Sequence, residues 1–160
     1  MSWSSGKDSA FALHTVRSEH DIEVTGLLVT VNADADRVAM HAVRRTLLEA
    51  QADRLGLPLQ VVEIPSSCPN DVYETRMAAA IAAAQDAGID HIVFGDLFLE
   101  DVRAYRERNL EPTGITPMFP LWGRRTDRLA RDMLGAGIRA VLTCVDPARP
   151  ARRVRRAAFR

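Results

Sequence analysis

The sequence is poor in the residues that mark several specialised classes of protein. Its two cysteines, Cys68 and Cys144, lie far apart and in no metal-like spacing, so two reduced thiols are expected. No hydrophobic run approaches the roughly 20 residues that cross a bilayer, and the polar N-terminus does not resemble a signal peptide. The formal net charge is zero, which favours neither a membrane nor a nucleic acid as partner. We therefore expect a cytoplasmic protein.

Lysine is almost absent, because Lys7 stands alone beside 20 arginines. It lies in SSGKDS, residues 4–9, a stretch rich in serine close to the N-terminus. Lysine binds phosphate as a compact point charge, whereas the planar fork of arginine is bulkier. The position of the one lysine is better explained by a phosphate ligand than by chance.

Patterns typical of buried strands alternate with helical patterns along the chain. The predicted strands cover residues 22–31, 57–65, 89–96, 115–122 and 138–146, after a short first strand ending at Ser2-Trp3, and the predicted helices cover residues 8–20, 38–56, 70–88, 99–110 and 125–137. This order predicts an α/β protein with a three-layer, Rossmann-like fold around a mostly parallel sheet of about five strands. In such a sheet, ligands bind beyond the carboxyl ends of the strands.

The C-terminal stretch ARPARRVRRAAFR, residues 148–160, differs from the rest of the chain. It carries six arginines and no acidic residue, so residues 1–147 have a formal charge of −6. We expect one domain over residues 1–147 and a disordered, arginine-rich tail over residues 148–160. The tail could bind nucleic acid in a salt-dependent way, but Phe159 is its single aromatic residue, so nucleic acid is disfavoured as a partner.

The turn at residues 4–9 lies where the first strand gives way to a helix, and such a turn can bind an anion. Its backbone amides and the positive end of the helix favour negative charge at one place. The hydroxyls of Ser4, Ser5 and Ser9 add further donors. Gly6 permits a positive φ or a close approach of the backbone to a ligand.

Two phosphate-binding patterns can be compared with this turn. The Walker pattern G-x-x-x-x-G-K-[S/T] is excluded, because Met1 stands at its first glycine and Asp8 follows Lys7 where serine or threonine is required. The PP-loop pattern S-G-G-x-D-S of ATP pyrophosphatases is matched, with Ser5 in place of the first glycine. The turn is therefore interpreted as a pyrophosphate-binding loop.

The stretch SWSSGKDSAFAL resembles the PP-loop of the diphthine–ammonia ligase family, and three further segments are similar to that family. They are Met40-His41 with Gln51-Ala52 and LGLP at 55–58, FGDLFLEDVRAYRERNL at 94–110 with FPLWG at 119–123, and AGIRAVLTCVD at 136–146. The resemblance extends over residues 1–147. It implies an adenine nucleotide alpha hydrolase-like fold, in which these residues form the nucleotide-binding domain.

The resemblance implies an ATP-dependent, AMP-forming ligase. ATP would be cleaved between its α- and β-phosphates, a carbonyl or carboxylate acceptor would be adenylated, and ammonia or another nucleophile would displace AMP to form an amide. The implied cofactors are ATP and Mg²⁺, the acceptor is unknown, and a homodimer is one possible assembly. The implied nucleotide-binding residues are Ser4, Ser5, Gly6, Lys7, Asp8, Ser9, Asn32, His41, Gly95 and Asp96. The implied catalytic residues are Lys7, Asp8 and Arg103, and the implied Mg²⁺ ligands are Asp8 and Asp96.

Several of these residues also have purely structural interpretations. Asp8 could cap the first helix instead of holding Mg²⁺. His41 could be a half-buried residue on an apolar helix face. Asn32 and Asp34, which follow a strand, could form a turn rather than contact adenosine.

The charged helix predicted over residues 99–110 has the same ambiguity. Glu100, Arg103 and Glu107 share one face, which could be a solvated surface with weak ion pairs. Its place after a strand favours the nucleotide cleft instead. Trp122 could line that cleft or belong to the core.

Two other functions are considered. Relatives continue with a Glu/His-bearing substrate portion where this chain has its arginine-rich tail, so a non-catalytic ATP- or AMP-binding module is the main alternative. A tRNA-thiolating enzyme is disfavoured, because Cys68 and Cys144 form no CxxC pair and cannot hold an iron–sulfur cluster by themselves.

Overall fold

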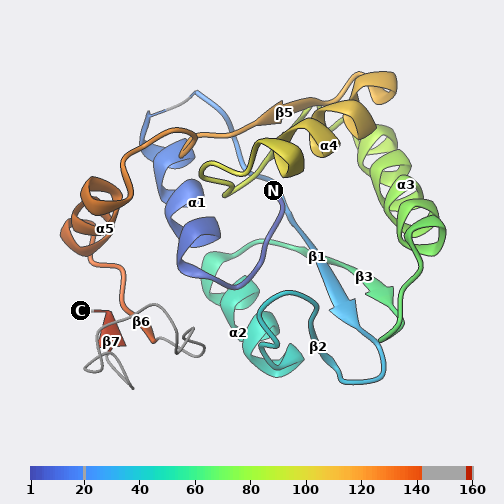
Figure 1. Ribbon diagram of the computed structural model, residues 1–160, viewed down its shortest axis with the longest axis horizontal. Coiled ribbons are helices and arrows are strands. Elements are labelled where there is room, and N and C mark those ends of the chain that lie inside the picture. The colour runs from blue at the N-terminus through green and yellow to red at the C-terminus, as the bar shows by residue number, and fades with distance from the viewer. Residues whose placement is uncertain (20, 142–157, 160) are drawn as a thin grey trace. The chain divides into compact units, whose positions relative to one another are not determined.

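The computed structural model describes residues 1–19, 21–141 and 158–159 (Figure 1). The chain divides into two compact units, Met1–Gly123 and Arg124–Arg160. The arginines of the predicted tail and Cys144 lie outside the described residues. The first unit contains every residue that the sequence predicts for the nucleotide site.

Helices and strands alternate along the first unit, as predicted for an α/β protein. Its elements are α1 (Lys7–Glu19), β1 (Leu27–Asn32), β2 (Arg37–Val38), α2 (Arg45–Leu55), β3 (Leu59–Ile64), α3 (Asn70–Asp86), β4 (His91–Val93), α4 (Glu100–Leu110), the 3₁₀ turn η1 (Glu111–Thr113) and β5 (Thr116–Met118). The second unit contains α5 (Thr126–Gly135), β6 (Ala140–Val141) and β7 (Ala158–Phe159), and β6 and β7 pair antiparallel.

The strands form small sheets rather than the predicted parallel sheet of about five strands. One sheet has the order β2-β1-β3, with β3 parallel and β2 antiparallel to β1, and a second sheet pairs β4 with β5 in parallel. The prediction of one mostly parallel sheet was therefore too regular. Several strands are only two or three residues long, so their ladders are short.

The predicted first strand is reduced to a few residues that join the two sheets. The Met1 carbonyl accepts a hydrogen bond from the Leu28 amide at 2.8 Å, and the Trp3 amide donates to the Leu28 carbonyl at 2.7 Å. On its other side, the Ser2 amide donates to the Val93 carbonyl of β4 at 2.9 Å. The N-terminal segment thus lies between β1 and β4, and the loop that follows it starts just past Val93, the last residue of β4.

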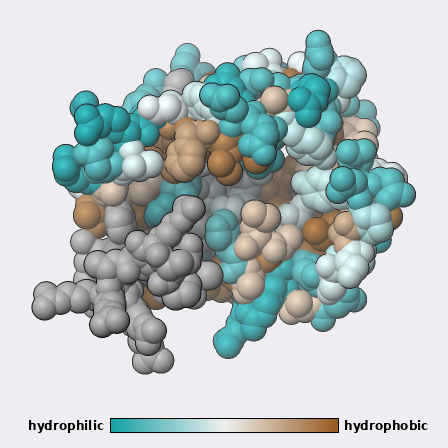
Figure 2. All heavy atoms as spheres, viewed as in Figure 1, coloured by the Kyte–Doolittle hydropathy of each residue, from teal (hydrophilic) through white to brown (hydrophobic). Residues whose placement is uncertain are grey.

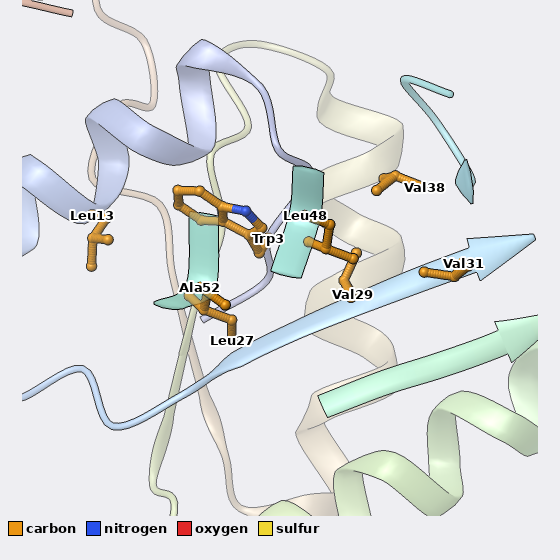
Figure 3. Close-up of a cluster of buried hydrophobic side chains, with 8 residues drawn as sticks. All are labelled: Trp3, Leu13, Leu27, Val29, Val31, Val38, Leu48 and Ala52. Carbon is orange, nitrogen blue, oxygen red and sulfur yellow. The ribbon is translucent and has the colours of Figure 1, made fainter. Parts of the chain in front are cut away.

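Side chains alternate across β1 and so build two apolar layers. Leu27, Val29 and Val31 belong to the same buried cluster as Trp3 and the α2 residue Leu48 (Figure 3). Leu28 instead packs with the cluster that β3 shares with α3. Helices α1 and α2 therefore cover one face of β1 and β3, and α3 covers the other (Figure 1).

The helix predicted over residues 38–56 starts later than expected. Residues 37–38 pair with β1, residues 39–42 form a turn, and α2 begins at Arg45. Ala42 adopts a φ of 51°, which a helix cannot contain. Gly56, with a φ of 65°, ends α2 as predicted and donates its amide to carbonyls of the last turn.

Hydrophilic residues occupy much of the face shown in Figure 2, and hydrophobic side chains reach it in a few patches. None of the helices in the described ranges is long and apolar enough to cross a membrane.

Candidate functional site

The turn at residues 4–9 forms a cradle of donors at the N-terminus of α1. The helix begins at Lys7, so the amides of its first turn have no partner within the helix. The Ser4 hydroxyl lies 3.1 Å from the Ser9 hydroxyl, which donates to the Gly6 carbonyl at 3.0 Å. These hydrogen bonds lie within the turn and stabilise its conformation without a ligand. A preformed set of amides at a helix start is suited to phosphate.

Ser5 holds the strained position of this turn. Its φ is 60°, in the left-handed region that glycine tolerates best. Its hydroxyl is buried and has no hydrogen-bond partner among the described residues. The positive φ considered for Gly6 therefore belongs to Ser5, which explains why the PP-loop pattern has glycine there. A buried, unpartnered hydroxyl is costly unless a ligand supplies its partner.

The lack of a side chain at Gly6 lets two other side chains lie close to its backbone. A Cβ atom at Gly6 would lie 3.3 Å from Ser4 Oγ and 3.5 Å from His41 Cε1. The His41 ring also places Nδ1 3.1 Å from the Ser4 carbonyl oxygen. His41 is exposed and belongs to the turn before α2, so its interpretation as a residue on an apolar helix face was wrong. The structure instead places its ring beside Ser4 and Gly6 of the loop.

Lys7 and Asp8 form an ion pair at the mouth of the loop. Lys7 Nζ lies 2.6 Å from Asp8 Oδ1, and the two side chains are 37% and 34% exposed. The pair is solvated enough to contribute little stability, and a bound phosphate can replace Asp8 as the partner of the Lys7 ammonium group. Asp8 lies in the first turn of α1, where a negative charge is favourable. Both of its predicted roles thus stay compatible with its position.

Gly95 joins the end of β4 to the loop. A Cβ atom there would lie 2.9 Å from the Ser9 backbone nitrogen and 3.1 Å from the Asp8 carbonyl oxygen. Such distances are shorter than van der Waals contact allows, so only glycine fits. Gly95 therefore acts through packing, by letting the backbone of the first turn of α1 settle against β4.

Asp96 is engaged by an arginine rather than free for a metal ion. Arg106 Nε donates to Asp96 Oδ2 at 2.6 Å, and both side chains are largely buried. The Arg106 guanidinium also lies 4.3 Å from the centre of the Phe94 ring. The described residues contain no group of three or more His, Cys, Asp or Glu side chains that could hold a metal ion. Asp8 is also paired, with Lys7 at 2.6 Å, but its side chain is more exposed than that of Asp96, 34% against 19%, so Asp8 is the better-placed of the two predicted Mg²⁺ candidates.

Arg103 is held by aromatic rings and one carboxylate. Its Nε donates to Glu107 at 2.7 Å, which is the ion pair of the structural interpretation. Its guanidinium lies 4.8 Å from the ring centres of both Phe119 and Trp122. Trp122 is half-buried and meets Phe119 edge-on. The arginine is therefore rigidly placed, with donors that Glu107 does not use.

Asn32 and Asp34 are used within a turn. The side-chain oxygen of Asn32, Oδ1, accepts hydrogen bonds from the Ala35 amide at 2.9 Å and the Ser66 hydroxyl at 3.1 Å. Asp34 accepts from the Ser66 amide at 2.8 Å, and its hydrogen bonds with Ser66 lower the pKa of its carboxyl group. The two side chains tie the end of β1 to the segment after β3, as the structural interpretation expected.

Two features of the site were not predicted: what Gln51 contacts, although the family resemblance includes this residue, and a cavity beside the loop. Gln51 accepts a hydrogen bond from Trp3 Nε1 at 3.1 Å, and so anchors α2 to the residue before the loop. A cavity of about 350 Å³ opens beside Ser4, and its lining includes Thr30, Tyr73, Met77, Phe94, Tyr105 and Asn109. Burial of the Tyr73 hydroxyl in this region raises its pKa. The spacing of Tyr73 and Met77, four residues apart on α3, was the one available signal for this cavity.

Comparison with known proteins gives a match to a family model. No curated protein matches the chain. The family model described as the diphthamide synthase N-terminal domain matches residues 1–117, which include the loop, His41, Gly95 and Arg103. This match spans most of the chain, from the loop through α4. The chain therefore belongs to the diphthamide synthase N-terminal domain family, the ATP-binding domain of diphthine–ammonia ligase.

Proposed function

We propose that the chain binds ATP with its phosphates on residues 4–9 and forms AMP and pyrophosphate when an acceptor is adenylated. The observation that carries this proposal is the buried Ser5 hydroxyl, which has no hydrogen-bond partner in the described part of the chain and lies beside the amides that begin α1. A phosphate oxygen would accept from that hydroxyl and from the amides at once. Lys7, at the mouth of the same loop, would add the positive charge.

The chemistry needs little covalent participation by the protein. An oxygen of the acceptor carboxylate or carbonyl attacks the α-phosphorus, and the bond to the bridging oxygen of the β-phosphate breaks. The electron pair leaves with pyrophosphate, whose growing charge the loop amides and Lys7 stabilise. A nitrogen nucleophile then attacks the adenylated carbon, loses a proton, and AMP departs. Mg²⁺ would neutralise phosphate charge, with Asp8 the loop carboxylate able to face it through water.

The nucleoside end of ATP is assigned to the cavity beside Ser4. Its volume of about 350 Å³ and its walls of aromatic and aliphatic side chains suit a flat, mostly apolar ring system. Thr30, Tyr105 and Asn109 supply polar groups within those walls. Asn32 and Asp34 are poorer candidates, because their oxygen atoms already hold a turn together. The cavity shares Ser4 with the loop, so one molecule can occupy both.

Calorimetric titration tests the loop and the cavity separately. The Lys7→Ala substitution should raise the Kd for ATP and for inorganic triphosphate alike, by about tenfold to a hundredfold, since it removes one charge-assisted contact. Arg17→Ala is the matched control, because it removes an exposed charge from the far end of the same helix. Equal affinities for Lys7→Ala and Arg17→Ala would contradict binding at the loop.

Filling the cavity tests the nucleoside assignment. Met77→Trp should reduce ATP affinity to that of inorganic triphosphate while triphosphate binding is unchanged, which also shows that the fold is intact. A Met77→Trp protein that still prefers ATP over triphosphate would place the nucleoside elsewhere. ATP binding without any AMP production across carboxylate acceptors and amine donors would favour the non-catalytic module.

A further inference from the structure

The turn at residues 39–42, between β2 and α2, carries an unusually exposed hydrophobic side chain. Met40 is 83% exposed, more than any other large hydrophobic residue that the structure describes. A single exposed methionine is ordinary on a protein surface, so its location decides whether it has a function. Met40 also lines the cavity of about 350 Å³ beside Ser4. It belongs to the cavity wall and is open to solvent at once, which places it at the mouth of the cavity.

The chain that leads into Met40 is fixed on β1. Val38 is buried and pairs with Val31 of β1. The Ala39 amide then donates to the Thr30 carbonyl at 3.0 Å, and Thr30 is itself part of the cavity wall. The backbone directly before Met40 is therefore held at the wall of the cavity.

The chain that leaves Met40 is fixed at the loop. His41 Nδ1 lies 3.1 Å from the Ser4 carbonyl oxygen. Ala42 closes the turn, because its amide donates to the Val38 carbonyl at 2.9 Å and its carbonyl accepts from Arg37 Nη1 at 2.8 Å. Met40 is thus anchored through the residues on both sides of it. We refer to residues 39–42 as the strap.

Neighbouring residues of the strap reach the two halves of the nucleotide site. The proposed function, on which this inference rests, places the phosphates on residues 4–9 and the nucleoside in the cavity. His41 lies at the phosphate half and Met40 at the nucleoside half. Because the Cα atoms of consecutive residues are about 3.8 Å apart, the strap lies at the junction of the two halves. A nucleotide that occupies both halves runs alongside it.

The chemistry of methionine suits a cover over a flat ring. Its side chain has three rotatable bonds and a polarisable sulfur atom, which makes favourable contacts with aromatic rings. Tyr73, Phe94 and Tyr105 line the cavity with rings of their own, and Met40 adds a flexible side chain at its mouth. A nucleoside bound against Met40 would remove exposed apolar surface from water, which is favourable.

We propose that Met40 covers the nucleoside at the mouth of the cavity and so determines how strongly the site prefers ATP to inorganic triphosphate. Met40 acts by burying apolar surface, since a thioether is at most a weak hydrogen-bond acceptor. Its contribution therefore belongs to the affinity for ATP and is absent from the affinity for triphosphate. His41, the next residue of the strap, lies on the phosphate side of this division.

Calorimetric titration with ATP and with inorganic triphosphate tests this role. Met40→Ala should raise the Kd for ATP by about threefold to tenfold and leave the Kd for triphosphate unchanged, since only the nucleoside loses a contact. Met40→Leu should keep most of the ATP affinity, because leucine retains the apolar volume. Leu47→Ala is the matched control, since Leu47 is 54% exposed in the first turn of α2 and lies outside the lining of this cavity. All three residues replaced are exposed, so the Tm should stay the same.

Labelling the methionine methyl groups with ¹³C gives a second readout by NMR. The chain has five methionines, and both Met40 and Met77 line the cavity. The Met40 methyl signal, assigned from its absence in Met40→Ala, should shift on addition of ATP and stay in place on addition of triphosphate. The Met77 signal should also shift with ATP, and it reports separately that the base has entered the cavity.

The two methyl signals distinguish a failure of the strap from a failure of the site. ATP that shifts the Met77 signal and not the Met40 signal would overturn the role of Met40 and leave the proposed function in place. The same conclusion would follow if Met40→Ala had the ATP affinity of Leu47→Ala. If neither ATP nor triphosphate binds to the unmodified protein, the proposed function is wrong and the role of Met40 is overturned with it.

Discussion

Gly95 and Ser9 lie so close that no other residue fits at position 95, because a Cβ atom there would be 2.9 Å from the Ser9 backbone nitrogen. This contact ties the end of β4 to the first turn of α1. The phosphate cradle is thus positioned by packing of main chain on main chain, and its geometry depends on a residue that has no functional group of its own.

Replacing Gly95→Ala should therefore damage the loop and the fold together. The added methyl group must push the first turn of α1 away from β4, and we expect a loss of about 2 kcal/mol in the free energy of unfolding with weaker ATP binding. Urea denaturation and calorimetry measure the two effects. Gly135→Ala is the control, since a Cβ atom at Gly135 meets nothing within 4 Å and alanine suits a helix. Similar effects of both substitutions would contradict this account of Gly95.

Ser5 should show opposite effects on stability and on binding. Ser5→Gly relieves a left-handed serine and removes a buried hydroxyl for which the described residues supply no partner, so the free energy of unfolding should rise by about 1 kcal/mol. ATP affinity should fall, because the phosphate loses a donor. Ser5→Ala separates the two causes, since it lacks the hydroxyl but keeps the strain. An unchanged ATP affinity in both variants would argue against the hydroxyl as a ligand.

The Asp96–Arg106 pair predicts a structural effect of substituting Asp96. Asp96→Asn leaves a largely buried guanidinium without its carboxylate, and should lower the free energy of unfolding by about 1 to 2 kcal/mol. The dependence of ATP binding on Mg²⁺ concentration should stay as in the unmodified protein. A stable Asp96→Asn protein that has lost its Mg²⁺ dependence would instead make Asp96 a metal ligand.

The buried amino group of Met1 predicts a pH dependence of stability. Its pKa is about 6 in the folded protein and 8.0 when unperturbed, so the unfolded chain binds more protons between these values. The free energy of unfolding should therefore rise by about 2 kcal/mol as the pH increases from 6 to 8. Below pH 6 the folded protein bears the full cost of burying a protonated amino group, and above pH 8 this cost is absent.

The matched control for this prediction is the N-acetylated protein, with retention of Met1 verified by mass spectrometry. Acetylation removes the titrating amine while the histidines stay in both proteins, so the difference between the two denaturation profiles isolates Met1. Parallel profiles over this pH range would show that the amino group does not contribute.

Local patterns predicted the elements of this fold better than their assembly. The alternation of strands and helices and the stop of α2 at Gly56 follow from hydrophobic spacing and glycine chemistry, which are local. The division into small sheets could not be predicted in this way. It depends on how far residues 1–3 extend along two edges, and those edges come from segments far apart in the sequence.

The loop was recognisable because its chemistry is concentrated in consecutive residues, from Ser4 to Ser9. The resemblance alone pointed to His41, because residue spacing predicted a helix over residues 38–56 and did not reveal the turn at Ala42 that carries the ring to the loop. The partners of Asp96 and Asn32 were equally hidden, because carboxylate and amide groups after a strand suit a ligand, an ion pair or a turn alike. The cavity beside Ser4 combines side chains from several elements and needed the tertiary structure.

The central claim is that the loop at residues 4–9 holds the phosphates of ATP, and a crystal structure with ATP and Mg²⁺ tests it most directly. The account predicts phosphate oxygens within hydrogen-bond distance of Ser5 Oγ and of the first amides of α1, with the base in the cavity lined by Tyr73 and Met77. ATP bound elsewhere, with the Ser5 hydroxyl still unpartnered, would contradict it.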